Sequence, residues 1–367
     1  MRLSQLELSS FRNYTRAGFE FDLHANVIYG RNGGGKTNIL EAIFLLSTLH
    51  SFRSNDQKSL IQTGKEEARI KGKIEHHGIE KNLGLFITAG GKKASLNDKF
   101  IKKTSGYLGT FYTVSFNPLD MQILQGGPQG RRQCIDRMLF NFDPLYGNEL
   151  MRYYRMLLQR NMALRVGAWE MVQLWWEKLY KLAAKIIFKR LQFIQKLTRL
   201  TSSQYRAIAG MDVNVDIQYH TNVFPGNFNN ITEEDLLISL DQKQKNLCQE
   251  ERRLKRSLVG PHRDDFSIIV GGNDLRKLGS QGEQRTAILA IKLSELEALE
   301  AETGFRAVVL LDDIASELDE SRRRYLFELL DENKTQIFVT TTDRNTALLP
   351  RRKARFFHIQ EGQITGE

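Results

Sequence analysis

The sequence predicts an α/β fold whose core is assembled from both ends of the chain, with a helical insertion between them. Near the N-terminal end, a glycine-rich loop at residues 30–37 lies between a short apolar strand and a helix-forming run. Near the C-terminal end, an apolar strand at 308–311 leads into two carboxylates. From about residue 129 to residue 206 the pattern is helical with few turn residues. We therefore expect residues 1–125 and 250–367 to form the core and residues 126–249 to form the insertion.

The individual elements follow from periodicity and turn residues. Alternation at residues 3–8 and the apolar run at 27–29 predict strands. Strand patterns at 83–88 and 266–270 each run into a glycine-containing turn, which is typical of a β-hairpin. The last hundred residues alternate between helix and strand, with helices expected at 284–300 and 320–330 and strands at 307–311 and 337–339.

The composition is that of an ordinary globular protein, with 41% apolar and 26% charged residues in 367. No apolar run approaches the roughly 20 residues that cross a bilayer, so we expect no membrane segment. The two cysteines, Cys134 and Cys248, lie far apart and lack metal-ligand spacing. A disulfide framework is therefore excluded as the basis of the fold, and we expect a reducing compartment, the cytoplasm by default.

The positive charge of the chain is concentrated in one segment. Lys and Arg number 53 against 43 Asp and Glu, a formal net charge of +10. Residues 151–210 hold twelve bases and two acids, Glu170 and Glu177, which accounts for the whole excess. This pattern indicates either a local anionic partner or a solvated helix surface.

Eight consecutive residues fit the phosphate-binding pattern G-x-x-x-x-G-K-[ST], namely Gly30, Arg31, Asn32, Gly33, Gly34, Gly35, Lys36 and Thr37. Glycines let successive backbone N–H groups turn toward phosphate oxygens, and the following helix presents its N-terminus to the anion. Lys36 would supply charge to the β and γ phosphates, and the Thr37 hydroxyl would bind Mg²⁺. The loop therefore predicts a nucleotide phosphate site.

Two carboxylates, Asp312 and Asp313, follow the apolar strand at 308–311. The carboxyl edge of a parallel sheet is where α/β proteins bind ligands. Asp312 would act on the metal, directly or through water, and Asp313 would orient or deprotonate the attacking water. In isolation the same pair would be a solvated acidic turn.

Ser280 precedes a long amphipathic helix and is followed closely by Gly282 and Glu283. A serine before a helix is an ordinary N-cap, and Glu283 would complete a capping box. A helix N-terminus with a hydroxyl and a glycine is also an anion site. Spacing alone leaves both interpretations open.

At these residues the chain resembles the ABC-type ATPases and, within them, the RecF family, which is related to SMC proteins. Residues 280–284, Ser-Gln-Gly-Glu-Gln, are similar to the ABC signature motif, and residues 316–319, Ser-Glu-Leu-Asp, to the D-loop. Residues 10–14, 30–42, 258–265 and 310–319 resemble RecF-type stretches. About 275 residues separate Lys36 from Asp312, too few for the long coiled-coil arms of SMC proteins. The resemblance implies an ABC-type P-loop ATPase core of mixed sheets with flanking helices.

The resemblance also implies ATP and Mg²⁺ as cofactors and an ATP-dependent homodimer. Lys36 and Thr37 of one subunit would hold the nucleotide, while Ser280 and Gly282 of the other would cover its γ-phosphate. The closed dimer would bind duplex DNA at gaps or at single-strand/double-strand junctions. It would act with RecR and RecO to load RecA during repair and replication.

Two departures from the family pattern affect the expected chemistry. Leu119 stands where the family segment has an acid, so that acid's role is not carried over, and Gln122 becomes the candidate for a Q-loop-like water ligand. Asp313 stands where most ABC-type ATPases have Glu, as in RecF-type proteins. Its shorter arm predicts slow turnover, not above the range of about 1–100 s⁻¹ typical of kinases.

Six cations in the middle segment recur at helical spacing and form the predicted DNA surface: Lys178, Lys181, Lys185, Lys189, Lys196 and Arg199. At about 100° per residue they fall within an arc of roughly 80°, beside an apolar arc. Such a face suits a phosphate backbone without sequence readout. A solvated helix face, a partner-protein surface and an anionic-membrane helix anchored by Trp175 and Trp176 are the other interpretations.

Two other functions fit the same motifs. An ATPase subunit that drives a transporter would need a surface for a membrane partner, and it would leave the localised charge unexplained. An adaptor or clamp that binds ATP with negligible hydrolysis would not need Asp313 for chemistry.

Overall fold

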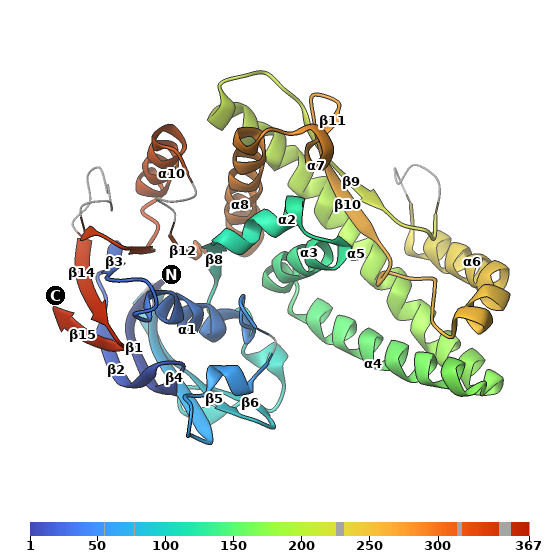
Figure 1. Cartoon of the computed structure of the whole chain (residues 1–367), viewed down its shortest axis with the longest axis horizontal. Coiled ribbons are helices and arrows are strands. Elements are labelled where there is room, and N and C mark those ends of the chain that lie inside the picture. Colours follow the sequence, from blue (N-terminus) through green and yellow to red (C-terminus); the bar gives the residue numbers. More distant parts are fainter. Residues whose placement is uncertain (55, 77, 225–230, 314–317, 345–353, 367) are drawn as a thin grey trace. The chain divides into compact units, whose positions relative to one another are not determined.

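The computed structural model describes residues 1–54, 56–76, 78–224, 231–313, 318–344 and 354–366. The chain forms two compact units (Figure 1). Unit 1 comprises Met1–Asp120 and Glu295–Glu367, and unit 2 comprises Met121–Ser294. Unit 1 is therefore built from both ends of the chain, and unit 2 is inserted between them.

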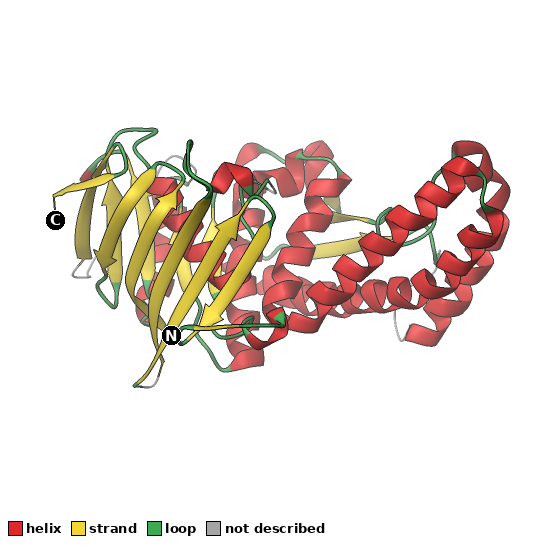
Figure 2. Ribbon diagram, turned by 90° about the horizontal axis from the view of Figure 1, so that it is seen from below, coloured by secondary structure: helices red, strands yellow, loops and turns green. Residues whose placement is uncertain are grey.

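Unit 1 contains two six-stranded sheets, whose strands lie side by side in Figure 2. The first is antiparallel, with the order β2-β1-β4-β5-β6-β7, and the second has the order β15-β14-β3-β13-β12-β8. In the second sheet all neighbours are parallel except β15 and β14. The elements of unit 1 are β1 (Arg2–Phe11), β2 (Tyr14–Glu20), β3 (Ala25–Tyr29), α1 (Lys36–Thr48), β4 (Glu67–His76), β5 (Ile79–Thr88), β6 (Gly91–Leu96), β7 (Lys99–Phe100), β8 (Thr113–Phe116), β12 (Val308–Leu311), α10 (Glu320–Glu332), β13 (Ile337–Thr341), β14 (Ala354–Gln360) and β15 (Gln363–Gly366).

Helix α1 lies between the two sheets of unit 1. It contacts β4 and β5 of the first sheet and β8 and β13 of the second. Its middle, from Ile39 to Leu46, is buried throughout and is apolar on all sides except at Glu41. Gly72 in β4 permits the close approach, because a Cβ there would lie 2.6 Å from Leu46 Cδ1. The helix that follows the glycine-rich loop is therefore held firmly on both faces.

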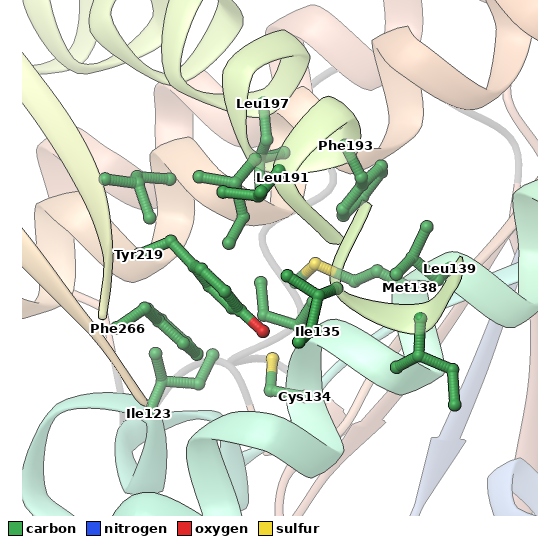
Figure 3. Packing of buried hydrophobic residues seen from close by; sticks show 14 of the residues in the cluster. Ile123, Cys134, Ile135, Met138, Leu139, Leu191, Phe193, Leu197, Tyr219 and Phe266 are labelled. Carbon is green, nitrogen blue, oxygen red and sulfur yellow. The ribbon is translucent and has the colours of Figure 1, made fainter. Parts of the chain in front are cut away.

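Unit 2 is mostly helical and carries a three-stranded antiparallel sheet of order β11-β10-β9. Its elements are α2 (Gln122–Gln125), α3 (Pro128–Phe142), α4 (Pro144–Val166), α5 (Trp169–Ala209), β9 (Val215–His220), α6 (Glu233–Leu254), β10 (Asp265–Val270), β11 (Asn273–Asp274), α7 (Leu275–Leu278) and the start of α8 (Gln281–Thr303), which continues into unit 1. In Figure 3, Cys134 and Met138 of α3 and Leu191 of α5 lie with Tyr219 of β9 and Phe266 of β10. This cluster forms the hydrophobic core of unit 2.

The α/β architecture and both predicted hairpins are confirmed. β5 pairs with β6, and β10 pairs with β11 across Gly271 and Gly272. The strand before Asp312 is buried and parallel to both of its neighbours, as the apolar run indicated. Among the described residues, no helix has both the length and the apolar composition needed to cross a bilayer.

The second boundary between the units differs from the expected one at residue 250. β10 pairs along its whole length with β9, from Asp265 opposite His220 to Val270 opposite Val215. Val259 also belongs to the core of unit 2. Residues 250–294 are therefore part of unit 2, because their strand partner lies in the insertion, and periodicity does not reveal strand partners.

A fully buried ion pair joins two helices of unit 2. Arg160 of α4 donates to Glu251 of α6 at 2.6 Å, and the two side chains are 0% and 1% exposed. Arg160 also donates to Ser257 Oγ at 2.6 Å, and its guanidinium lies 5.2 Å from the Trp176 ring centre. Removing one partner of such a pair leaves an uncompensated buried charge.

Arg160→Ala should therefore lower the free energy of unfolding by about 3–5 kcal/mol, measured as a lower thermal or urea midpoint by circular dichroism. Lys245→Ala is the matched control, since Lys245 pairs with Asp241 on the exposed side of α6. The control should change stability by less than about 1 kcal/mol. Equal losses of unfolding free energy in the two variants would show that the buried pair stabilises the protein no more than an exposed pair does.

Candidate nucleotide-binding site

The glycine-rich loop connects the end of β3 to the start of α1. β3 lies between two parallel neighbours, β13 and β14, so the loop is at the carboxyl edge within the sheet. The N-cap of α1 is Gly35, with φ 115° and no side-chain cap. The backbone N–H groups of Lys36 and Thr37 are therefore available to an anionic ligand, whereas the Asn38 N–H donates to Gly35 O at 3.0 Å.

Two glycines of this loop are required by backbone conformation and by space. Gly30 has φ 144° and Gly35 has φ 115°, which L side chains rarely adopt. A Cβ on Gly30 would lie 2.2 Å from Ile359 O, and one on Gly35 would lie 2.9 Å from Tyr14 Oη. The loop thus passes directly against β14 and against the start of β2.

Groups outside the loop hold its carbonyl oxygens, and we name Asn13, Tyr14 and Gly362 together the loop brace. Asn13 Nδ2 donates to Gly34 O at 3.0 Å, and the Gly362 N–H donates to the same oxygen at 2.9 Å. Tyr14 Oη donates to Gly35 O at 3.0 Å. The C=O and N–H of one trans peptide point in opposite directions, so these bonds turn the two following N–H groups toward the other side.

Further polar contacts fix the loop brace to α1. Asn38 Nδ2 donates to Asn13 Oδ1 at 2.8 Å, and Arg53 Nη1 donates to Asn38 Oδ1 at 2.9 Å. Arg12 makes a two-pronged ion pair with the buried Glu41, at 2.8 and 2.7 Å. The turn between β1 and β2 is therefore tied to the helix whose N-terminus faces the site.

Lys36 is folded back over the loop. Its Nζ donates to Gly30 O at 2.7 Å and to Arg31 O at 3.0 Å. Burial lowers the pKa of Lys36, and the charges of Asp313 and Asp312 oppose that shift. The ammonium group thus lies on the loop, within the field of both carboxylates.

Thr37 and Asp312 are brought together from distant parts of the chain. Thr37 Oγ1 donates to Asp312 Oδ1 at 2.9 Å, and Thr340 Oγ1 of β13 donates to the same oxygen at 2.7 Å. Burial raises the pKa of Asp312, while the hydrogen bonds from Thr340 and Thr37 oppose that shift. A hydroxyl beside a carboxylate at the end of a phosphate-binding loop is a donor set that suits Mg²⁺.

Asp313 lies next to this pair. Its φ is 51°, in the left-handed region, and its N–H donates to Thr340 Oγ1 at 3.0 Å. The following residues 314–317, which include Ser316 and Glu317 of the D-loop-like motif, lie outside the described residues. Asp319 is described, and its side chain caps α10 by accepting from the Arg322 N–H.

Ser280 forms the capping box that spacing suggested. Its N–H donates to Glu283 Oε2 at 2.8 Å, and the Glu283 N–H donates to Ser280 Oγ at 3.3 Å. Ser280 is exposed and Gly282 is half-buried, both at the start of α8. Gln122 is also exposed, at the start of α2. The capping role is present, and an exposed Ser280 remains accessible to a ligand or a second subunit.

All six predicted DNA-binding cations lie on α5, but two of them are already paired. Lys185 lies 3.3 Å from Glu149, and Lys189 lies 2.7 Å from both Glu149 and Asp143. The two acids precede or begin α4, outside the segment whose charge was counted. Of the other four, Lys178 is near the Trp175 ring and Lys196 near the Phe142 ring, whereas Lys181 and Arg199 are exposed.

The stretch at 258–265 has a structural role within unit 2. Arg190, buried on α5, donates to Pro261 O at 2.8 Å, and Arg131 makes a two-pronged pair with Asp265. Tyr153 Oη lies 2.5 Å from His262 Nδ1. Burial lowers the pKa of His262 to about 4, so this ring is neutral at pH 7.

Sequence reasoning assigned no role to the loop brace or to Thr340. Asn13 and Tyr14 belong to a stretch that resembles the family, but no local pattern shows that they reach the loop. The sequence around Gly362 predicts a turn and nothing more. Thr340 could have been found, because it is a polar residue at the carboxyl end of a strand next to the one that precedes Asp312.

Known proteins resemble the chain over its full length. A sequence model of the RecF/RecN/SMC N terminal domain matches residues 2–365. The DNA replication and repair protein RecF of Geobacter sulfurreducens is 36% identical over 366 residues, which cover 100% of both chains. The RecF protein of Geotalea uraniireducens is 35% identical over 365 residues, covering 99% of this chain and 100% of the relative.

Solved structures give the same result. The recombination mediator protein RecF in complex with ATP, from the RecFOR pathway, matches with a TM-score of 0.90 and 32% identity over 99% of this chain and 96% of that chain. An Smc head domain from Pyrococcus furiosus matches with a TM-score of 0.52 and 16% identity over 98% of this chain and 94% of that chain, a likeness of fold alone. The chain therefore belongs to the RecF family of DNA replication and repair proteins and has the fold of its ABC-type ATPases.

Proposed function

We propose that this protein binds and slowly hydrolyses ATP in order to dimerise on duplex DNA at single-strand gaps or junctions in the cytoplasm. There it would act with RecR and RecO in loading RecA during repair and replication. The observation that carries the proposal is the 2.9 Å contact between Thr37 and Asp312 beside an uncapped helix N-terminus. A relative with 32% identity that binds ATP supports the choice of nucleotide.

Each residue of the site has a role in this proposal. The N–H groups of the loop would bind phosphate oxygens, and Lys36 would exchange its two carbonyl contacts for the β and γ phosphates. Thr37 and Asp312 would hold Mg²⁺, which when bound neutralises charge on the phosphates. Asp313 would accept the proton of a water whose oxygen attacks the γ-phosphorus as the bond to the ADP oxygen breaks.

A second copy of the chain would complete the site. Its Ser280 and Gly282 would lie over the γ-phosphate, where the start of α8 offers a hydroxyl. The capping bond of Ser280 to Glu283 is exposed, so the hydroxyl could turn to a phosphate oxygen. Loss of the γ-phosphate by hydrolysis would then weaken the dimer.

The cationic face of α5 is the proposed DNA surface. The ion pairs of Lys185 and Lys189 with acids of unit 2 reduce their share of the attraction to phosphate. Lys181 and Arg199 are exposed and would contribute more. Phosphate contacts of this kind would make the affinity for duplex DNA fall steeply with salt.

Asn13→Ala should weaken ATP binding by up to about thirtyfold, because it removes two hydrogen bonds that orient the loop and each contributes about 1 kcal/mol. Equilibrium titration with ATP before turnover measures the effect. Thr15→Ala is the control, since Thr15 is exposed and, among the described residues, its side chain bonds only Gln62. An unchanged affinity in Asn13→Ala would show that the loop brace does not orient the phosphate-binding groups.

Asp313→Asn should lower the turnover of ATP by about 10²- to 10⁴-fold and leave ATP affinity nearly unchanged, because it removes a proton acceptor but no phosphate contact. Single-turnover assays of ATP hydrolysis would measure the loss. Glu320→Gln, an exposed change at the start of α10, should keep full activity. If wild type and Asp313→Asn turn over equally slowly, the protein is an ATP-bound clamp and not a catalyst.

Light scattering should show the mass of a dimer for the wild type with ATP, and with ATP plus duplex DNA, but not without nucleotide. Ser280→Arg should remain a monomer in all three conditions because its side chain would block the site across the interface, whereas Ser280→Thr keeps the hydroxyl and should dimerise. Both variants should bind ATP normally. A normal ATP-dependent dimer of Ser280→Arg would leave Ser280 with its capping role alone.

A further inference from the structure

Exposed apolar side chains gather on one part of unit 2. Fifteen large apolar residues of the described chain are exposed, and nine of them lie between residues 145 and 174, on α4 and the start of α5. Exposed apolar residues scattered singly need no explanation, whereas a contiguous patch indicates an interaction site. Neither the ATP site nor the cationic face of α5 uses these residues.

Helix α4 has one buried face and one exposed apolar face. Tyr153, Leu157, Arg160 and Leu164 are buried toward the rest of unit 2. The exposed face carries what we name the α4 stripe, with side chains 40% to 80% exposed: Met151, Tyr154, Leu158, Met162 and Val166. At about 100° per residue these five positions fall within roughly 120° of arc, so they form one continuous row. Figure 1 shows α3 and α5 on the inner side of α4.

The unpaired charges of α4 within or next to the arc of the α4 stripe have one sign, and the exposed acid Glu170 lies at the start of α5. Arg155 and Arg165 are exposed and fall inside the same arc, with Arg152 at its margin. Within the described chain, no carboxylate forms an ion pair with these three arginines. The one acid of α4, Glu149, is already paired with Lys185 and Lys189. The face is therefore apolar and cationic, with its cations available to an external acid.

The start of α5 extends this surface. Trp169, Met171 and Leu174 are 41% to 44% exposed. Arg252 of α6 lies over the Trp169 ring, with its guanidinium 4.7 Å from the ring centre. A large aromatic side chain beside arginines is typical of the residues that dominate protein–protein interfaces.

We propose that the α4 stripe and the start of α5 dock an amphipathic helix of a partner protein, one whose apolar row is flanked by acidic residues. Its apolar row would pack along the α4 stripe, and its carboxylates would pair with Arg155 and Arg165. Methionines at positions 151, 162 and 171 can repack around such a helix. This inference is independent of the proposed ATP cycle.

Other occupants match this surface less well. Duplex DNA would leave the apolar row exposed, since phosphate recognition needs cations and not a line of Met and Leu. A second α4 placed against this one would set arginine against arginine. A bilayer would take Arg155 and Arg165 into the hydrocarbon with the stripe, at considerable cost, because both lie within the apolar arc.

The test uses the full chain without nucleotide and a fluorescein-labelled 18-residue helical peptide, with leucines at i, i+3, i+4 and i+7 and glutamates beside them. Fluorescence anisotropy should show saturable binding of this peptide and at least tenfold weaker binding of the same peptide with lysine in place of glutamate. Leu158→Ala with Met162→Ala should weaken binding of the acidic peptide at least tenfold, and Arg155→Glu should do the same. Ile238→Ala, an exposed apolar change on α6, is the control and should bind as wild type does.

The variants alter exposed positions, and circular dichroism should show unchanged folding. The proposal is overturned if the lysine peptide binds as well as the acidic one, or if the stripe variants bind as wild type does. It is also overturned if phosphatidylglycerol vesicles, and not the peptide, bind in a stripe-dependent way. If the wild type is a dimer without nucleotide and the double variant Leu158→Ala, Met162→Ala is a monomer, the surface binds a second copy of the chain instead.

Discussion

The hydrogen bond from Thr37 to Asp312 joins two residues 275 positions apart, and the site exists only because one parallel sheet holds them in register. Val339 of β13 pairs with Val27 of β3 on one side and with Leu311, the last residue of β12, on the other, and β3 continues two residues further, to Tyr29 opposite Thr341. Thr340 then points its hydroxyl at Asp312. A slip of one residue in β13 would turn Thr340 to the opposite face and leave Asp312 without that donor. The chemistry of the loop therefore depends on strand pairing as much as on the glycines.

The sequence predicted those parts of the site that are formed by residues adjacent in the chain. The eight loop residues are contiguous, and an apolar run predicts the strand before Asp312. The positions of the loop and of Asp312 therefore followed from the sequence. The loop brace did not, because Asn13, Tyr14 and Gly362 come from elsewhere in the chain and meet the loop only after folding. The boundary at residue 250 was misplaced for the same reason, since β10 finds its partner in the insertion. Periodicity reports which face of an element is buried and not which element covers it.

A charge count along the sequence is limited in a similar way, because it does not show which charges pair in the fold. A count over residues 151–210 gives a net excess of ten cations, yet the surface of α5 is less positive than this because Asp143, just before α4, and Glu149 of α4 pair with its lysines. Glu149 is the one acid of α4 and is paired, so the exposed Arg155 and Arg165 lie beside the apolar α4 stripe without a carboxylate of their own helix. Two neighbouring helices thus present different surfaces. One is cationic and partly neutralised, and the other is apolar with cations available.

The order of strands in the second sheet bears on how the protein is made. Among the strands of the described residues, β3 lies between β13 and β14 and β8 pairs with β12 alone, so both N-terminal strands of this sheet find their partners in the last 60 or so residues. During synthesis all of unit 2 leaves the ribosome first. For that interval β3 and β8 carry unpaired backbone edges and α1 lacks one of its two covering sheets, and such edges invite wrong pairing. Truncated chains, or a ribosome that pauses late in the message, should therefore release a folded insertion attached to an incomplete, aggregation-prone core.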